Sequence, residues 1–314
     1  MQGLRAIAAA LSVASVAILT CAVALMSLTP PAHADSSARE LASYYERHMA
    51  LDGDVAYGWI GSGQPRRLRA GVVQVGVSQD ADFALLADGT LLTWTDAPAA
   101  ATTLMRDVAA FAAGASGWFA IDRAGVLWHA SADSAAPRRL ADGVVAACIG
   151  DSADYYVTRD GTLYVKGLAH RGQYGDGRLA ATDDFVATAR DTVAVKAHTG
   201  HAIHLRRDGV VMGTGGNRYG PLSTHGLGDK ADRWGPIFDG AVAIATGSRH
   251  SLAIRADGSL WAWGAGFAVQ PARLLGNVRA VAAGDSATIA RTPDGALWQW
   301  DDGARTPPRR LTLR

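Results

Sequence analysis

Residues 247–264 read GSRHSLAIRADGSLWAWG, in which two runs of branched and aromatic residues flank an Asp-Gly pair. Asp-Gly between such runs predicts a tight β-hairpin, because both turn residues take positive φ, which Gly accepts freely and Asp tolerates. Apolar residues at alternating positions suit a strand that is buried on one face. The stretch therefore predicts two short antiparallel strands that are joined at Gly258.

This hairpin recurs along the chain. Its glycines, preceded by Asp in every copy except Ala124-Gly125, are Gly53, Gly89, Gly125, Gly161, Gly209, Gly258 and Gly295. Successive copies lie 36, 36, 36, 48, 49 and 37 residues apart. A period of this size indicates one supersecondary unit that is copied many times.

Two further strands complete the unit. One is VRAVAAG at 278–284, with related sequences at 144–150 and 242–247. The other is a Pro-x-Arg-Leu strand, found at 65–68, 137–140, 271–274 and 308–311. Proline at the first position of a strand removes no ladder donor. Four short strands in each period are the sequence pattern of a propeller blade.

Seven hairpins predict an all-β, seven-bladed propeller of four-stranded blades over residues 52–314. The first copy is a fragment at 52–57, and the tail at 308–314 begins another copy and stops. We therefore expect the N- and C-terminal strands to share one blade and close the ring, which removes exposed edge strands. Six blades is the alternative if the fragment does not pair. Residues 35–51 form an N-terminal segment for which a short helix is the expectation.

The repeats resemble those of the regulator of chromosome condensation family. The resemblance rests on residues 247–264 and on the tails GLAHRGQYG at 167–175 and GNRYGPL at 216–222, which are similar to the family's Gly-x-Asn-x-x-Gly-Gln-Leu-Gly. It implies a seven-bladed propeller. Members of the family include a nucleotide-exchange factor for a nuclear GTPase and protein-binding domains, among them a secreted bacterial inhibitor of β-lactamases. Fold alone carries none of these functions across.

The N-terminus has the pattern of an export signal. Arg5 precedes an uncharged apolar stretch at 6–28, and Ala32-His33-Ala34 forms a small-x-small cleavage site. We predict that residues 1–34 are a signal peptide cleaved after Ala34, which places the protein in a bacterial periplasm or outside the cell. An uncleaved membrane anchor is the alternative, because the apolar run is long.

Composition excludes some classes of partner. The chain has 30 Lys and Arg against 29 Asp and Glu, and removal of Arg5 leaves 29 of each. A net charge near zero gives no electrostatic argument for nucleic acid or for an anionic membrane. Cys148, the one cysteine that remains after cleavage, is expected to be a small buried residue, so the mature chain can form no internal disulfide.

Two patterns resemble catalytic or metal sites. Gly-Asp-Ser at 150–152 and 284–286 is similar to serine-hydrolase motifs, but both copies occupy one repeat position, which favours a polar turn. His198, His201 and His204 are spaced three apart, so neighbouring side chains would lie on opposite faces of a strand. We therefore predict no catalytic residue and no metal or other cofactor.

The tryptophan pairs at 261/263 and 298/300 put both members on one strand face. Such pairs could stack on a sugar or a base. Because that face recurs from blade to blade, we expect it to lie in the core between blades.

The fourth and fifth copies are each about twelve residues longer than the period, with the extra residues around 167–190 and 213–238. Since these copies are neighbours, both insertions are expected on one face. Their candidate partner-binding residues are His170, Arg171, Tyr174, Asn217, Arg218, Tyr219, His225 and Trp234, with Arg178 beside them. Tyr, Trp and Arg are common anchors of interfaces. The alternative is that both segments are full-length family tails without a binding role.

These observations favour an exported, non-enzymatic, monomeric propeller that binds a protein through the two long loops. Nothing in the sequence names the partner. A carbohydrate-binding or enzymatic propeller would instead use the central channel and would need acids or histidines converging there, for which the spacing gives no support. A guanine-nucleotide exchange factor is the third class, and the export signal argues against it.

Overall fold

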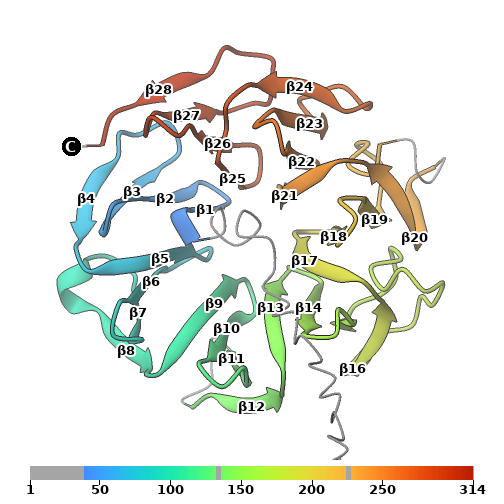
Figure 1. Ribbon diagram of the computed structural model, residues 1–314, viewed down its shortest axis with the longest axis horizontal. Coiled ribbons are helices and arrows are strands. Elements are labelled where there is room, and N and C mark those ends of the chain that lie inside the picture. Colours follow the sequence, from blue (N-terminus) through green and yellow to red (C-terminus); the bar gives the residue numbers. More distant parts are fainter. Residues whose placement is uncertain (1–38, 132–135, 224–227, 314) are drawn as a thin grey trace, which may run out of the picture.

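The computed structural model describes residues 39–131, 136–223 and 228–313, so the predicted signal peptide lies outside the described residues. Over the described ranges, 28 strands form seven four-stranded antiparallel sheets, arranged as the blades of a ring (Figure 1). The predicted seven-bladed, all-β propeller is confirmed. No helix in the described part of the chain has the length and apolar character needed to cross a membrane.

Each blade is continuous in sequence. Blades 1 to 4 comprise β1 (Leu41–Tyr44), β2 (Arg47–Asp52), β3 (Val55–Ile60) and β4 (Arg66–Arg69); β5 (Val72–Val77), β6 (Asp82–Leu86), β7 (Leu91–Trp94) and β8 (Thr102–Met105); β9 (Val108–Gly114), β10 (Gly117–Asp122), β11 (Leu127–Ser131) and β12 (Arg138–Ala141); β13 (Val144–Ile149), β14 (Ala153–Thr158), β15 (Leu163–Gly167) and β16 (Thr182–Ala189). Blades 5 to 7 comprise β17 (Thr192–Ala197), β18 (His201–Arg206), β19 (Val211–Gly216) and β20 (Lys230–Phe238); β21 (Ala241–Thr246), β22 (His250–Arg255), β23 (Leu260–Gly264) and β24 (Ala272–Leu275); β25 (Ala280–Ala283), β26 (Thr288–Arg291), β27 (Leu297–Trp300) and β28 (Arg309–Leu311). One short 3-10 helix, η1 (Pro98–Ala100), lies between β7 and β8.

The strand order within each blade follows the sequence from the central channel outwards (Figure 1). Because successive strands are antiparallel, the connections between strands 1 and 2 and between strands 3 and 4 emerge on the same face of the ring. We call this the mouth face. The Asp-Gly hairpins between strands 2 and 3, and the connections between blades, lie on the opposite face. The seven inner strands line a channel of about 230 Å³.

The hairpins form where predicted, but the turn differs in detail. In blade 2 the Leu86 amide donates to Thr90 O, and the Gly89 amide donates to Leu86 O, so the loop has three residues and only the glycine takes positive φ, at 88°. The expectation that Asp88 also has positive φ is wrong. Its carboxylate instead accepts the Thr90 amide at 2.8 Å. Asp is therefore suited to this position by its side chain, which stabilises the turn.

The same turn joins one blade to the next. The carbonyl of Gly89 accepts the amide of Val108, the first residue of β9, at 2.9 Å. A Cβ atom on Gly89 would lie only 3.3 Å from the Val108 carbonyl oxygen. The hairpin glycines of blades 3 to 6 accept an amide from the next blade in the same way. The Asp-Gly pair thus sets both the hairpin and the joint between blades.

The expectation that the two ends of the chain share a blade is wrong, because blades 1 and 7 are each complete. Within the described residues of the segment 35–51, the expected short helix is limited to Arg39 and Glu40, since β1 and β2 follow and the propeller begins at Leu41 rather than at residue 52. These strands lack the Val-x-x-Val-Ala-Ala pattern of the other copies. They nevertheless pair with each other along β1, and Leu41 and Tyr44 are both buried.

Side-chain contacts between blade 7 and blade 1 close the ring. The Trp59 indole donates to Gln299 Oε1 at 2.7 Å, and Gln299 Nε2 donates to the Gly61 carbonyl at 3.0 Å. Beneath them, Leu41 packs with Ile289 in a shared hydrophobic cluster. Closure therefore depends on packing and side-chain hydrogen bonds instead of a shared sheet.

Two predictions about the core are confirmed, the first of them in part. Of the two tryptophan pairs, Trp263 and Trp300 are almost completely buried within clusters between blades, as expected, whereas Trp261 and Trp298 are only partly buried. Cys148 is buried as well, and its sulfur accepts the amide of Ala197 in the next blade at 3.2 Å.

Candidate functional site

The two long insertions lie on the mouth face and contact each other. Part of each predicted range is strand, since β16 and β20 fall within 167–190 and 213–238, and the connections themselves are 168–181 and 217–229. The Gly177 amide donates to Asp232 O at 2.8 Å, and the Trp234 amide donates to Gly175 O at 2.9 Å. The structure thus brings the two insertions together, as their adjacency in sequence predicts. His225 lies outside the described residues.

Three of the candidate binding residues hold these loops in place. Tyr174 is completely buried, and its hydroxyl donates to Gly167 O at 2.8 Å. Asn217 is buried too, and its side-chain oxygen accepts the Leu222 amide at 3.0 Å. Trp234 is half-buried and meets the His204 ring edge-on, with the ring centroids 4.7 Å apart. Neither Tyr174 nor Asn217 is available as an anchor for a partner.

The remaining candidates are exposed. His170, Arg171 and Arg218 face solvent, and Tyr219 is 46% exposed. The guanidinium carbons of Arg218 and Arg249 lie 5.9 Å and 5.2 Å from the centroid of the Tyr219 ring. An exposed aromatic ring beside two guanidinium groups forms an amphipathic contact surface.

Exposed apolar side chains concentrate on the mouth face. Six of the eight large exposed hydrophobic residues in the described part of the chain lie at 1–2 or 3–4 connections, namely Tyr45, Ile60, Leu168, Leu179, Tyr219 and Val269. The other two, Val73 and Val145, lie near the start of inner strands, towards the opposite face. Single exposed apolar residues are normal, so it is the asymmetry between the faces that is informative.

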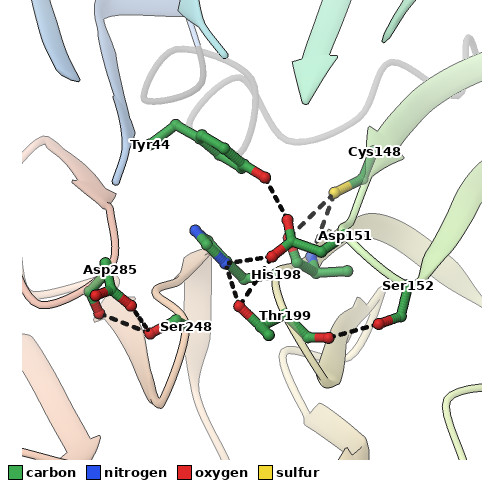
Figure 2. A network of polar contacts seen from close by, with 9 residues as sticks. Tyr44, Cys148, Asp151, Ser152, His198, Thr199, Ser248 and Asp285 are labelled. Carbon is green, nitrogen blue, oxygen red and sulfur yellow. Dashed lines mark hydrogen bonds and ion pairs between the residues drawn. The ribbon is translucent and has the colours of Figure 1, made fainter. Parts of the chain in front are cut away.

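The seven 1–2 connections surround the mouth of the channel. Each connection has an equivalent position, seven residues before the residue that opens the 2–3 hairpin of the same blade. These positions hold Tyr45, Gln79, Ala115, Asp151, Thr199, Ser248 and Asp285. Both Gly-Asp-Ser copies lie in these connections, which confirms that they are turns. The ring geometry also has a consequence that spacing alone did not show, because it places both acids near His198 (Figure 2).

A hydrogen-bond network links three blades at the mouth (Figure 2). The Tyr44 hydroxyl donates to Asp151 Oδ1, and the Thr199 hydroxyl donates to Asp151 Oδ2 at 3.0 Å. His198 Nδ1 lies 3.0 Å from the Thr199 hydroxyl and 3.8 Å from Asp151 Oδ2. The His198 ring stacks on Tyr44 with their centroids 4.9 Å apart. Beside them, the Ser248 hydroxyl donates to the Asp285 carboxylate.

Spacing in the sequence gives no support for acids and histidines that converge on the channel, but the structure brings both to its mouth. Asp151, Asp285 and His198 come from blades 4, 7 and 5, so their proximity follows from the ring and not from their spacing in sequence. The recurrence of Gly-Asp-Ser at one repeat position was the feature that could have revealed it, because equivalent positions in a closed ring face a common axis.

Burial determines the protonation states at this site. Desolvation, followed by the hydrogen bond to Asp151, raises the pKa of Tyr44, so its phenol stays protonated. Desolvation lowers the pKa of His198, and the charges of Asp151 and Asp285 oppose that shift only in part. The imidazole is consequently neutral near pH 7.

The three histidines spaced three apart have separate partners. His201 Nε2 lies 3.0 Å from the Ser251 hydroxyl of the next blade, and His204 Nδ1 lies 3.0 Å from the Thr192 hydroxyl. The contact between His201 and Ser251 has an equivalent one blade later, where His250 Nε2 lies 3.1 Å from the Thr288 hydroxyl. Within the described ranges, no three His, Cys, Asp or Glu residues are grouped as metal ligands would be.

Comparison with known proteins agrees with the repeat pattern. The model of the regulator of chromosome condensation (RCC1) repeat matches residues 241–267, which include β21, β22 and β23. A secretion-regulating guanine nucleotide exchange factor of Mus musculus is 32% identical over 152 residues, which are 44% of this chain and 32% of that protein. The ultraviolet-B receptor UVR8 of Arabidopsis thaliana is 27% identical over 126 residues, which are 35% of this chain and 27% of the receptor. Each match thus spans less than a third of the curated relative.

A solved structure has the same fold. Prp20p of Saccharomyces cerevisiae, described together with its binding to Gsp1p and histones, superposes with a TM-score of 0.66 and 16% identity. The match covers 78% of this chain and 80% of that chain. At this identity the likeness concerns the fold alone. One stretch of the chain thus matches the regulator of chromosome condensation repeat, and the whole seven-bladed fold is similar to that of Prp20p.

Proposed function

We propose that this protein is an exported, non-enzymatic propeller that binds another protein through its mouth face. The observation that carries the proposal is the asymmetry of exposed apolar residues, six of the eight lying on that face. Tyr219, beside Arg218 and Arg249, is the strongest single anchor, because it combines an exposed ring with two guanidinium groups.

The architecture suits such a role. The mouth face is made of connections, whereas the strands beneath it form a closed, rigid ring. A preorganised surface loses little conformational entropy on association, so a few anchors can give useful affinity. The export of the chain is inferred from the sequence of residues 1–34 alone.

Capture of a partner tests this proposal. The full chain would be expressed with a C-terminal tag in its own host, and partners would be recovered from the envelope and extracellular fractions. The Arg218→Ala/Tyr219→Ala variant should lose the captured protein while keeping its thermal stability. The matched control is Val73→Thr/Val145→Thr, which changes two exposed apolar residues towards the other face. Equal capture by the wild type and the Tyr219 variant would contradict the proposal.

Nucleotide exchange on a small GTPase is the second candidate function. It is favoured by the 32% identity to the secretion-regulating exchange factor. An exchange factor acts in the cytosol, so fractionation distinguishes the candidates. Recovery of the uncleaved chain in the cytosol would support exchange, whereas a chain that begins after Ala34 in the periplasm or medium would exclude it.

The channel mouth now meets the requirement for a channel enzyme, namely carboxylates with a histidine. However, three nearby serine hydroxyls are engaged elsewhere. Ser43 bonds to His48 at 2.9 Å, Ser152 donates to Thr199 O at 2.7 Å, and Ser248 donates to Asp285. None of these three hydroxyls is directed at His198, the histidine beside the two carboxylates, so the arrangement favours binding over covalent catalysis by a serine paired with that base.

A further inference from the structure

The direction of each hydrogen bond at the mouth follows from the number of protons available. Both oxygens of Asp151 accept, one from Tyr44 and one from Thr199. The Thr199 hydroxyl has a single proton and donates it to Asp151, so its oxygen must accept from His198 Nδ1. A neutral imidazole with a proton on Nδ1 presents a lone pair at Nε2.

That lone pair is unused within the protein. His198 is 4% exposed, and its Nε2 is buried without a hydrogen-bond partner. The residue lines the central channel, and Figure 2 shows its second ring nitrogen directed away from Asp151 and Thr199. Because buried polar atoms are nearly always paired in native proteins, an unpaired acceptor at a channel mouth indicates a ligand that donates a hydrogen bond.

The groups around this nitrogen favour a cation. The Tyr44 ring stacks on the imidazole, and the Tyr45 ring meets it edge-on at 6.0 Å. Tyr45 holds this place with φ of 48°, a conformation that is uncommon for an aromatic residue. The carboxylates of Asp151 and Asp285 border the site. Acceptors, aromatic faces and negative charge together recognise an N–H donor that carries positive charge.

Below the mouth the channel is lined mainly by small and branched apolar residues of the seven inner strands, and Lys196 is the charged residue among them. Such walls accept an alkyl chain. A planar guanidinium group is best matched by a carboxylate with two free oxygens, and both oxygens of Asp151 are engaged. A compact ammonium group does not depend on that two-oxygen match.

We propose that the channel mouth binds a primary ammonium group on an alkyl stem, which donates to His198 Nε2 and is balanced by Asp151 and Asp285. The ammonium belongs either to a lysine side chain of the bound protein or to a free alkylamine. The first source rests on the proposed function, and the second does not.

The direct test is titration of the full chain with n-butylammonium, followed by the ¹⁵N chemical shift of His198 Nε2. A saturable shift is expected, and the uncharged butan-1-ol at the same concentrations should give none. Asp151→Asn keeps the shape of the site but removes its charge, so binding should weaken by about tenfold. Asp142→Asn, at an exposed acid in a connection between blades, is the matched control and should bind as the wild type does.

If Asp151→Asn does not fold, Tyr45→Ala serves as the second variant, because Tyr45 is partly exposed and donates no hydrogen bond to Asp151. It should also weaken butylammonium binding. Equal shifts with butan-1-ol, or unchanged affinity in both Asp151→Asn and Tyr45→Ala, would overturn the proposal.

Partner capture then distinguishes the two sources. If Asp151→Asn loses both butylammonium and the captured protein, the ammonium is a lysine of the partner. If it loses only butylammonium, the ligand is a free amine. The Arg218→Ala/Tyr219→Ala variant should lose capture and still bind butylammonium, so failure of the docking surface and failure of the ammonium site give different results.

Discussion

At the scale of single residues, the repeated Asp-Gly pair explains most of the fold. The glycine supplies the positive φ that the turn needs, and its carbonyl accepts an amide of the next blade. The aspartate accepts an amide two residues on, as Asp257 does from Ser259 at 2.8 Å. Bonds from the side chain and backbone of Ser259 lower the pKa of Asp257, so the turn is best satisfied by the ionised carboxylate.

Two glycines allow the effect of backbone strain on stability to be separated from the effect of a close contact with the next blade. Gly258 and Gly71 have the same φ of 77°, but a Cβ on Gly258 would lie 3.3 Å from Asn277 Cα, while one on Gly71 would meet no atom within 4 Å. We expect Gly71→Ala to lower the free energy of unfolding by about 1 kcal/mol through strain alone. Gly258→Ala should lower it further, because the next blade must also move.

Urea denaturation of both variants measures this difference. Similar losses for Gly258→Ala and Gly71→Ala would show that the hairpin glycine does not act as a joint between blades.

At the scale of elements, the sequence predicted the strands that share the repeat pattern and missed those that do not. β22 and β23 follow directly from GSRHSLAIRADGSLWAWG. β1 and β2 were missed because they lack the consensus residues, although they pair with each other and Leu41 and Tyr44 are buried. The long insertions were located correctly, but residue type could not separate exposed residues that could contact a partner from buried residues that hold the loops in place. Tyr174 and Tyr219 have the same side chain and opposite exposure.

That contrast gives a prediction for the two tyrosines. Tyr174→Phe removes a hydroxyl that donates to Gly167 O and accepts the Thr182 amide at 3.0 Å, so it should lower the free energy of unfolding by about 1 kcal/mol. It should leave partner capture unchanged. Tyr219→Ala should weaken capture without a comparable loss of stability.

Thermal denaturation together with capture checks both variants. Loss of capture by Tyr174→Phe at a temperature where it is fully folded would contradict the assignment of Tyr174 to a structural role and of Tyr219 to partner binding.

At the scale of the whole molecule, the ring determines what the sequence could not show. Closure is achieved by Trp59, Gln299 and the cluster around Leu41 and Ile289, all far apart in the chain. The same closure brings Asp151, Asp285 and His198 to one mouth. A repeat pattern reports what is common to the blades. The site depends on the few positions where the blades differ, and on their order around the ring.

The contact between blades 7 and 1 should be sensitive to its central side chain. Gln299→Leu has a similar volume but leaves the Trp59 indole and the Gly61 carbonyl without this partner. We expect the free energy of unfolding to fall by about 1–3 kcal/mol, since buried polar groups lose their bonds. Gln79→Leu, on an exposed connection of blade 2, is the control, and urea denaturation is the measurement. An unchanged midpoint for Gln299→Leu would argue against closure through this contact.

Acid should weaken the whole ring. Burial lowers the pKa of His201 to about 3 and that of His250 to about 4, from an ordinary value of 6.5. Between pH 6.5 and 4 the unfolded chain therefore binds protons on these residues that the folded chain does not. Their contribution to stability is complete above pH 6.5 and falls as the pH drops, by up to about 1.4 kcal/mol per pH unit for each.

Asp154 acts in the opposite direction, because burial raises its pKa to about 6, and burial raises the pKa of Asp82 as well. These two carboxyls stand against six histidines whose pKa burial lowers, namely His48, His129, His198, His201, His204 and His250. The urea midpoint should thus decrease from pH 7 to pH 5, and His201→Gln should make that decrease smaller. A midpoint that rises over this interval would contradict the assignment of neutral, buried histidines.

The central claim is that the mouth face is the working surface of the propeller. Hydrogen–deuterium exchange on the complex with its captured partner tests it most directly, because both faces are read in one experiment. The account predicts slower exchange in the 1–2 and 3–4 connections, above all around Leu168, Tyr219 and Val269, with the Asp-Gly hairpins unchanged. Protection of the hairpins, with the mouth face exchanging as in the free protein, would contradict it.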